Sequence, residues 1–308
     1  MSHILPQPGF RIGHTTLEEA RTGVTVIAFD DRTLTAVEAR GAAPGTRELD
    51  AFAPGRLTPY ADAIVLTGGS AFGLRSADGV MQALATRQRG FPTSAGPVPL
   101  VPAAVVFDLA HGEPVAPEAS HGEAAFAAAL PVEQVAQGRV GAGTGTRWNN
   151  LGMEDPVAGG FGIGQISLPE GRITAVAVVN ALGTVLSAGT DHRQALLQHQ
   201  APAPAPGEQT TLVAIITDIP CDHAALVRCC VAGHDALARS IAPAHTMFDG
   251  DVVFASTTQR GEIGIDQLLR LHIGAELAVE AAIASAVQHS TNQSWPGQSP
   301  STPARSLP

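Results

Sequence analysis

A threonine at the start of an apolar run is the residue in this sequence best suited to chemistry. Thr210 follows a linker of alternating alanine and proline at residues 201–206 and precedes the apolar residues 212–216. Alternating proline is excluded from helices and central strands, and a short β-branched, apolar run after such a breaker predicts a buried strand. We therefore expect a hydroxyl at the first residue of a core strand.

A threonine hydroxyl becomes a useful nucleophile only beside a base. Cleavage of the Gln209–Thr210 bond would create one on the same residue, because the freed α-amine has a pKa of about 8. The pattern is thus typical of a self-cleaving N-terminal nucleophile. The same residues also allow an ordinary strand that follows a domain linker.

A second candidate group lies downstream, where Asp249 and Asp251 flank a single glycine. Two such carboxylates could bind a metal, orient an ammonium group or form a solvated turn, and further metal ligands are not close in sequence. His245, just upstream, could act as a base or ligand, although a single histidine is more often structural. Beside a free threonine amine, the two carboxylates are expected to hold and orient that amine.

The elements that must position these groups follow from apolar periodicity. Strands are expected at residues 63–66, 101–109, 160–168, 172–179 and 251–255, and helices at 71–88, 222–241 and 266–288. Residues 23–29 and 33–37 are expected to pair as a hairpin around Asp30 and Asp31. Without strict βαβ alternation, this mixture favours an α+β layered sandwich. Residues 1–289 should form one domain, and the Ser-, Pro- and Gln-rich residues 290–308 a disordered tail.

Composition excludes several classes of protein. The 308 residues include 44% hydrophobic, 15% charged and 4% aromatic residues, which predicts a large core of small aliphatic side chains. A net charge of −10 without a basic run argues against nucleic-acid and anionic-membrane partners, and no run is long enough for a membrane span. The three cysteines lack metal spacing, and the first residues lack a signal-peptide pattern. We expect a cytoplasmic protein.

Two glycine-rich segments resemble cofactor motifs but depart from them. In residues 67–73, Ser70 occupies the middle glycine of a dinucleotide fingerprint, and Phe72 occupies the last glycine of a nucleophile elbow. Residues 141–145 lack the Lys-Ser/Thr pair of a phosphate loop. We therefore expect neither a cofactor nor a metal.

Taken together and in order, these segments resemble the beta-peptidyl aminopeptidases, the D-aminopeptidase/esterases and the nylon-oligomer amide hydrolases. The matching segments are residues 41–48, 64–74, 101–109, 141–145, 177–183, 210–218 and 245–255. The resemblance implies a four-layer αββα sandwich of the autoproteolytic N-terminal-nucleophile type. It also implies self-cleavage into residues 1–209 and 210–308, which stay associated, and a homo-oligomer of four or more copies.

The resemblance also assigns roles. Thr210 matches the nucleophile, Asp249 and Asp251 match the positions that hold its amine, and Asn180 matches an oxyanion donor. Asn150 stands where amide-hydrolase relatives carry a catalytic lysine.

Three further positions are expected to line the substrate site, namely Gly69, Ser70 and Phe107, the last replacing a tyrosine of some relatives. At the cleavage site, Gln209 replaces the asparagine usual in close relatives.

The function expected from these residues is a metal-independent hydrolase that opens amide or ester bonds of small amine-bearing peptides or amides. Two alternatives remain open at this stage. Ornithine acetyltransferases have a similar sandwich and threonine nucleophile but pass the acyl group to an amine. The departures at Phe107, Asn150 and Gln209 would also suit an uncleaved ligand-binding paralogue without catalysis.

Overall fold

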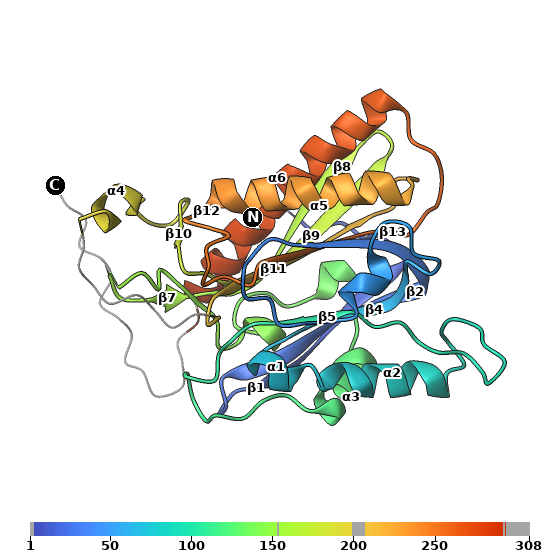
Figure 1. Ribbon diagram of the computed structural model, residues 1–308, viewed down its shortest axis with the longest axis horizontal. Helices are drawn as coiled ribbons and strands as arrows, with labels where there is room; N and C mark the ends of the chain where they lie inside the picture. The colour runs from blue at the N-terminus through green and yellow to red at the C-terminus, as the bar shows by residue number, and fades with distance from the viewer. Residues whose placement is uncertain (1–2, 153, 199–206, 292, 294–308) are drawn as a thin grey trace.

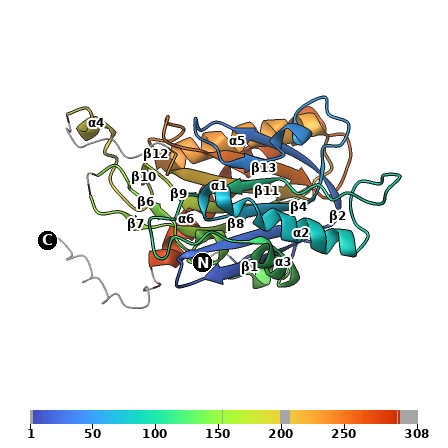
Figure 2. The ribbon, with the colours of Figure 1, turned by 60° about the horizontal axis from the view of Figure 1, so that its bottom comes forward.

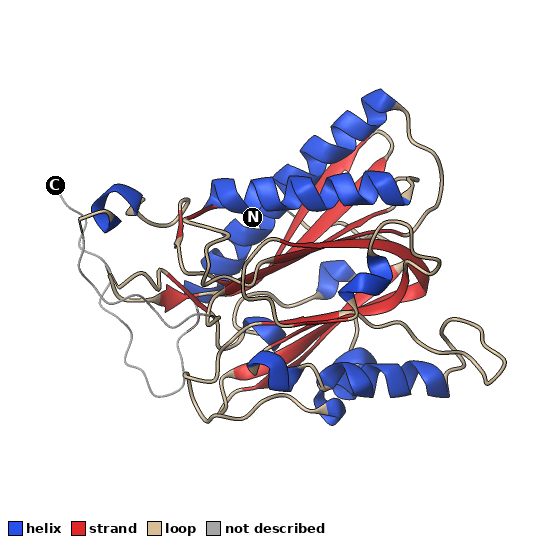
Figure 3. Ribbon diagram, in the orientation of Figure 1, coloured by secondary structure: helices blue, strands red, loops and turns tan. Residues whose placement is uncertain are grey.

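A computed structural model describes residues 3–152, 154–198, 207–291 and 293 of the chain. Two layers of β-strands lie face to face, with helices on both outer sides (Figures 1 and 3). This is the αββα sandwich expected from the sequence. Figure 2 shows the same order of layers from another side, with α5 on one side of the strands and α2 and α3 on the other.

One layer contains, at its centre, the strand that begins at Thr210. Its strands are, in order, β8 (Gly160–Leu168), β9 (Gly171–Asn180), β11 (Thr210–Thr217), β13 (Val252–Thr257) and the second half of β2 (Thr22–Ala39). The second layer contains the first half of β2 with β1 (Phe10–Leu17), β4 (Tyr60–Thr67), β5 (Ala103–Val105) and β3 (Thr46–Arg47). Helices α5 (His223–Ser240) and α6 (Ile265–Thr291) cover the first layer, and α2 (Ser76–Thr86) and α3 (Ala119–Ala127) cover the second.

The expected hairpin at residues 23–37 is wrong, because β2 runs through it as one strand. Its first half pairs with β1 and β4 and its second half with β13, and the register against β4 shifts between Ala28 and Thr33. Asp30 and Asp31 are exposed at this bulge. A bulge bends a strand and increases its twist. The acidic pair therefore marks the place where β2 passes from one layer to the other.

Three hydrophobic clusters separate the four layers. One lies between α5, α6 and their sheet, one lies between the two sheets, and one lies between α2, α3 and the second sheet. The residues of β11 alternate between the first two clusters, with Val213 and Ile215 facing the helices and Leu212 and Ala214 facing the other sheet. By this alternation, the Thr210 side chain points toward the space between the sheets.

Small residues allow α6 to lie directly on β8. An ideal Cβ on Gly162 would be 2.2 Å from the Ala282 carbonyl oxygen, and one on Gly164 would be 2.1 Å from that of Ala278. Such distances leave no room for a side chain on this face of the strand. The alanine- and glycine-rich composition is therefore what brings helix backbone and sheet backbone together.

The remaining elements are short. They are η1 (Leu49–Phe52), α1 (Ser70–Gly73), η2 (Val132–Gln134), η3 (Gly141–Gly143), β6 (Arg147–Trp148), β7 (Val157–Ala158), β10 (Thr184–Val185), α4 (Arg193–Leu196) and β12 (Ile241–Ala242). The helix expected at 71–88 is thus divided between α1 and α2. Of the expected tail, Ser290 and Thr291 belong to α6, while residues 294–308 and the linker 201–206 lie outside the described residues.

Three buried free cysteines, Cys221, Cys229 and Cys230, lie in and just before α5. Within the described ranges, no helix has both the length and the apolar character needed to cross a bilayer.

Candidate active site

Thr210 is buried at the first position of β11, and its hydroxyl lies against the peptide bond that precedes it. The Oγ1 donates to the Gln209 carbonyl oxygen at 2.5 Å. The same oxygen accepts the Gly250 backbone N–H at 2.8 Å. The Gln209 carbonyl is therefore polarised by two donors, and one of them is the Thr210 hydroxyl itself. This arrangement suits attack of Oγ1 on the Gln209 carbonyl carbon.

The Asp249–Asp251 segment lies beside this peptide bond because β13 runs parallel to β11. Gln209 and Asp249 form a parallel bridge just before the paired strands begin. The Asp249 carbonyl oxygen accepts the Ala43 N–H at 3.0 Å, so the loop at residues 41–45 packs over the segment. An ideal Cβ on Gly250 would lie 2.8 Å from the Thr210 Oγ1 and 2.6 Å from the Ala43 carbonyl oxygen. Only glycine fits between the loop and the hydroxyl.

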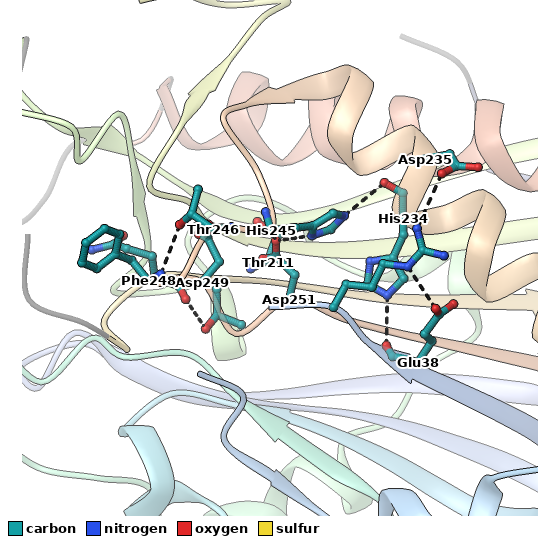
Figure 4. Close-up of polar contacts among 12 residues, drawn as sticks. Glu38, Thr211, His234, Asp235, His245, Thr246, Phe248, Asp249 and Asp251 are labelled. Atoms are coloured by element: carbon teal, nitrogen blue, oxygen red, sulfur yellow. Dashed lines mark hydrogen bonds and ion pairs between the residues drawn. The ribbon is translucent and has the colours of Figure 1, made fainter. Parts of the chain in front are cut away.

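Asp251 fixes the backbone just after Thr210. It is buried, and its Oδ1 accepts the Thr211 N–H at 2.7 Å. Its Oδ2 accepts the His245 backbone N–H at 3.1 Å and contacts the His245 Nδ1 at 2.8 Å (Figure 4). The carboxylate thus ties the start of β11 to the loop that follows β12.

Asp249 is also buried and accepts both the backbone N–H and the hydroxyl of Thr246, at 2.9 and 2.6 Å (Figure 4). Burial and then the charge of Asp251 raise the pKa of Asp249 to about 6, against the lowering effect of the Thr246 and Leu182 donors. Two carboxyl groups so close together do not ionise independently. Asp249 can therefore take up or release a proton near neutral pH.

Two asparagines lie on the other side of Thr210. Asn180 is opposite Thr210 in the β9–β11 ladder, and its Nδ2 donates to the Glu208 carbonyl oxygen at 3.0 Å and to that of Phe107 at 3.2 Å. Asn150 donates to the Gln209 Oε1 at 2.8 Å. The two amides therefore hold the residues before the Gln209–Thr210 bond, and the Gln209 carbonyl oxygen itself accepts the Gly250 N–H.

Of the three expected substrate-lining residues, Gly69 contacts the carboxyl of Asp108, which is buried. Gly69, with a φ of 79°, donates its N–H to the Asp108 Oδ1 at 2.7 Å. Ser70, also at positive φ, donates its N–H to the Val106 carbonyl oxygen at 3.0 Å. Phe107 meets the site through its backbone, since its carbonyl oxygen accepts from Asn180.

Three positions in or near this candidate site could not be assigned from the sequence: Gly250, His245 and Asp108. A backbone N–H leaves no mark on residue type, so the role of Gly250 could be suspected only from a glycine between two carboxylates. The partners of His245 and Asp108 come from distant parts of the chain. No local signal distinguishes such residues from surface ones.

The ionisation of Asp108 yields a test of this geometry. Burial raises its pKa to about 6, against the hydrogen bonds from Gly69 and Thr22. Since the folded-state pKa exceeds the unfolded value, stability is greatest below about pH 4 and declines as pH rises through about 6. A shift of about two units corresponds to roughly 3 kcal/mol. We expect Asp108→Asn to unfold with higher free energy than wild type at pH 8, and with about half of that difference at pH 5.

Urea unfolding at both pH values measures this effect, with the exposed Asp31→Asn as control. If the difference in unfolding free energy between Asp108→Asn and wild type is the same at pH 5 and pH 8, ionisation of Asp108 does not destabilise the fold.

Comparisons with known proteins agree with this architecture. Residues 3–297 match the sequence profile of peptidase family S58. An uncharacterized aminopeptidase of Mycobacterium leprae is 40% identical over 261 residues, covering 77% of this chain and 70% of the relative. A 6-aminohexanoate-oligomer endohydrolase of Agromyces sp. is 33% identical over 272 residues, covering 82% of this chain and 73% of the relative.

Solved structures share the fold at low sequence identity. A beta-aminopeptidase of Burkholderia sp. superposes with a TM-score of 0.72 at 21% identity, covering 94% of this chain and 90% of the other. The L-aminopeptidase D-Ala-esterase/amidase of Ochrobactrum anthropi, described as a variant of the Ntn hydrolase fold, gives a TM-score of 0.72 at 16% identity, covering 93% and 88%. The chain therefore belongs to peptidase family S58 and is a hydrolase with an Ntn-hydrolase-like fold.

Proposed function

We propose that the protein cleaves its own Gln209–Thr210 bond and then uses Thr210 as an N-terminal nucleophile on amides. The observation that carries this proposal is the contact of the Thr210 Oγ1 with the Gln209 carbonyl oxygen at 2.5 Å, with the Gly250 N–H on the same oxygen. Acyl transfer needs a nucleophile in reach and a donor where negative charge develops. Both are present at this one peptide bond.

Self-cleavage begins with an N→O acyl shift. The Thr210 Oγ1 forms a bond to the Gln209 carbonyl carbon, and the Gly250 N–H stabilises the oxyanion. The C–N bond then breaks, and the hydroxyl proton ends on the Thr210 nitrogen. Water hydrolyses the resulting ester, which leaves a Gln209 carboxylate and a free Thr210 amine. Asn150, on the Gln209 side chain, keeps the acyl group in place during these steps.

The mature site repeats the chemistry on a substrate. The Thr210 amine accepts the hydroxyl proton while Oγ1 attacks the substrate carbonyl carbon. The substrate C–N bond then breaks, and the Thr210 ammonium gives its proton to the leaving amine. Water hydrolyses the resulting ester, which releases the acyl group as a carboxylic acid and restores the Thr210 hydroxyl. Once residues 208 and 209 withdraw, the Asn180 amide, now on the Glu208 carbonyl, is released to donate to the substrate. We assign it a share of the oxyanion stabilisation together with the Gly250 N–H.

The substrate is proposed to be a small peptide or amide with a free amino group. The two buried carboxylates, Asp249 and Asp251, supply negative charge beside Thr210. The names of the relatives, aminopeptidase and 6-aminohexanoate-oligomer endohydrolase, describe enzymes whose substrates carry such groups, which supports the same class here.

The test compares β-alanyl and L- or D-alanyl p-nitroanilides with their N-acetylated forms. We expect release of nitroaniline from the free amines and at least about 100-fold less from the acetylated forms, the effect of an unpaired buried carboxylate. Comparable rates on both would contradict recognition of the amine. Acyl transfer to added amino acids without net hydrolysis would instead identify a transferase.

We also propose that the protein is a homo-oligomer, with α6 at an interface. Ile265, Leu269, Ile273 and Leu277 recur every fourth residue and are 79%, 60%, 46% and 47% exposed. Residues at this spacing share one helix face, and an exposed apolar stripe of this length is characteristic of an interface. The expected assembly has four or more copies.

Replacing two residues of this stripe with charges tests the assignment. We expect Leu269→Glu with Ile273→Glu to reduce the mass measured by light scattering, because the charges would have to be buried without partners. The exposed Gln259→Glu serves as the charge control and should keep the assembly. A monomeric wild-type protein would contradict the proposal outright.

A further inference from the structure

A buried group of charges lies behind the start of the nucleophile strand. Asp251, His245 and His234 form a line from β13 to α5 (Figure 4). Asp251 is the member that touches the nucleophile strand, through the Thr211 N–H at 2.7 Å. Its carboxylate accepts this N–H and the His245 backbone N–H, and it lies 2.8 Å from the His245 Nδ1. Such surroundings suit an ionised carboxylate, which in a buried position needs a counter-charge.

The His245 ring has an acceptor at each nitrogen. Its Nδ1 is 2.8 Å from the Asp251 Oδ2, and its Nε2 is 3.4 Å from the His234 carbonyl oxygen. A neutral imidazole has only one N–H, whereas the imidazolium has two. Both contacts are therefore hydrogen bonds only when the ring is protonated. Burial lowers the pKa of His245, but the hydrogen bond to Asp251 and the charge of Asp251 outweigh this effect. The pKa of His245 is therefore raised above its ordinary value.

The other titratable and charged groups around the His245 ring do not supply the counter-charge for Asp251. His234 packs edge-on against His245, with ring centroids 4.8 Å apart, and burial lowers its pKa to about 4, so it is neutral at pH 7. Arg40 is paired with Glu38 and Asp235 at 3.0 and 3.7 Å, and its charge acts to lower the pKa of His245. Asp249 adds a second carboxylate beside Asp251. His245 is thus the group placed to balance Asp251 directly.

We propose that His245 is a positioning residue whose protonated ring is the fixed counter-ion of Asp251. It keeps the carboxylate ionised and bound to the Thr211 N–H, and so holds Thr210, the residue immediately before, against the carbonyl it attacks. This role rests on the proposed function of Thr210. Among the described residues, the His245 ring contacts Asp251 and His234, and its effect on Thr210 passes through Asp251.

The positive charge of His245 has a consequence for pH dependence. Burial and then the charge of Asp251 raise the pKa of Asp249 to about 6, so protonation of this carboxyl falls in the range where activity is measured. Without the imidazolium, two neighbouring carboxylates lack a counter-charge, and the pair takes up a proton at higher pH. The acid limb of the rate profile should then move upward.

His245→Asn separates charge from hydrogen bonding, because the amide can still donate to Asp251 but carries no charge. We expect its acid limb, for self-cleavage and for hydrolysis, to lie about one pH unit higher than in wild type. At pH 6 this shift appears as a loss of about fivefold in rate, and at pH 8 the loss nearly disappears. His223→Gln is the matched control. His223 is the first residue of α5, and its ring contacts the Phe52 carbonyl oxygen and not Asp251. A uniform loss at every pH, with an unmoved limb, would reduce His245 to a packing role.

A second readout is independent of catalysis. The side-chain nitrogens of histidine can be observed by NMR in Thr210→Ala protein labelled with ¹⁵N-histidine, with His245 assigned by its loss in the Thr210→Ala/His245→Asn protein. We expect both ring nitrogens of His245 to be protonated at pH 7. A neutral ring at that pH would overturn the proposal. Because this chain lacks the nucleophile, the result does not depend on cleavage, and a failure of self-processing in wild type leaves it standing.

Discussion

Thr210→Ala is expected to remove both self-cleavage and hydrolysis. The Thr210 Oγ1 lies 2.5 Å from the Gln209 carbonyl oxygen, and in the proposed steps it is the atom that attacks first. Loss of the attacking residue of an acyl-transfer enzyme costs about 10⁶-fold in kcat. Thr210→Ser retains a hydroxyl on the same strand position and should keep cleavage at a reduced rate.

Thr211→Val is the control for this prediction. It removes the neighbouring hydroxyl while the backbone N–H of residue 211 remains bound to Asp251. Nitroanilide hydrolysis and gel mobility of the purified proteins measure both activities. Retention of hydrolysis in Thr210→Ala, or its loss only in Thr211→Val, would place the nucleophile elsewhere.

Gly250→Ala is expected to give the second largest loss. A Cβ here would lie 2.6 Å from the Ala43 carbonyl oxygen and 2.8 Å from the Thr210 Oγ1, so the backbone must move. That movement withdraws the N–H that now lies 2.8 Å from the Gln209 carbonyl oxygen. Removal of one oxyanion donor costs about 10²- to 10³-fold in kcat. The rate of precursor disappearance, followed after refolding or during expression, should fall by about that factor.

Gly264→Ala is a suitable control, because a Cβ there would meet only the flexible Gln267 side chain, at 3.4 Å. The melting temperature of each variant shows whether it is folded, and so whether a slower rate comes from the lost hydrogen-bond donor or from unfolding. If Gly250→Ala is folded and cleaves at the wild-type rate, the oxyanion is stabilised by another group.

The sequence predicted the layered fold and the start of β11 because these depend on local pattern. An alanine–proline linker, a threonine and a buried apolar run together define the position of Thr210 without knowledge of any partner. The resemblance then placed Asp249, Asp251 and Asn180 near it. The structure brings all of these residues to the ends of three adjacent strands, β9, β11 and β13.

Features that depend on distant contacts could not be predicted. Asp30 and Asp31 have the composition of a turn, yet β2 pairs with β4 and β13 in succession, and these tertiary pairings override the local preference. The role of His245 could not be assigned from the sequence, because its contacts with Asp251 and His234 arise only when α5 packs behind β13. Asp108 was part of a strand-like segment, and its burial against Gly69 follows from the meeting of two loops.

Denaturing intact mass of the purified wild-type protein, beside Thr210→Ala, tests the central claim most directly. We predict fragments of 209 and 99 residues, the latter being 308 − 209, with the smaller fragment beginning at Thr210. The Thr210→Ala chain should remain whole. A wild-type chain that stays intact after prolonged incubation, or that is cut at another bond, would contradict an N-terminal threonine nucleophile.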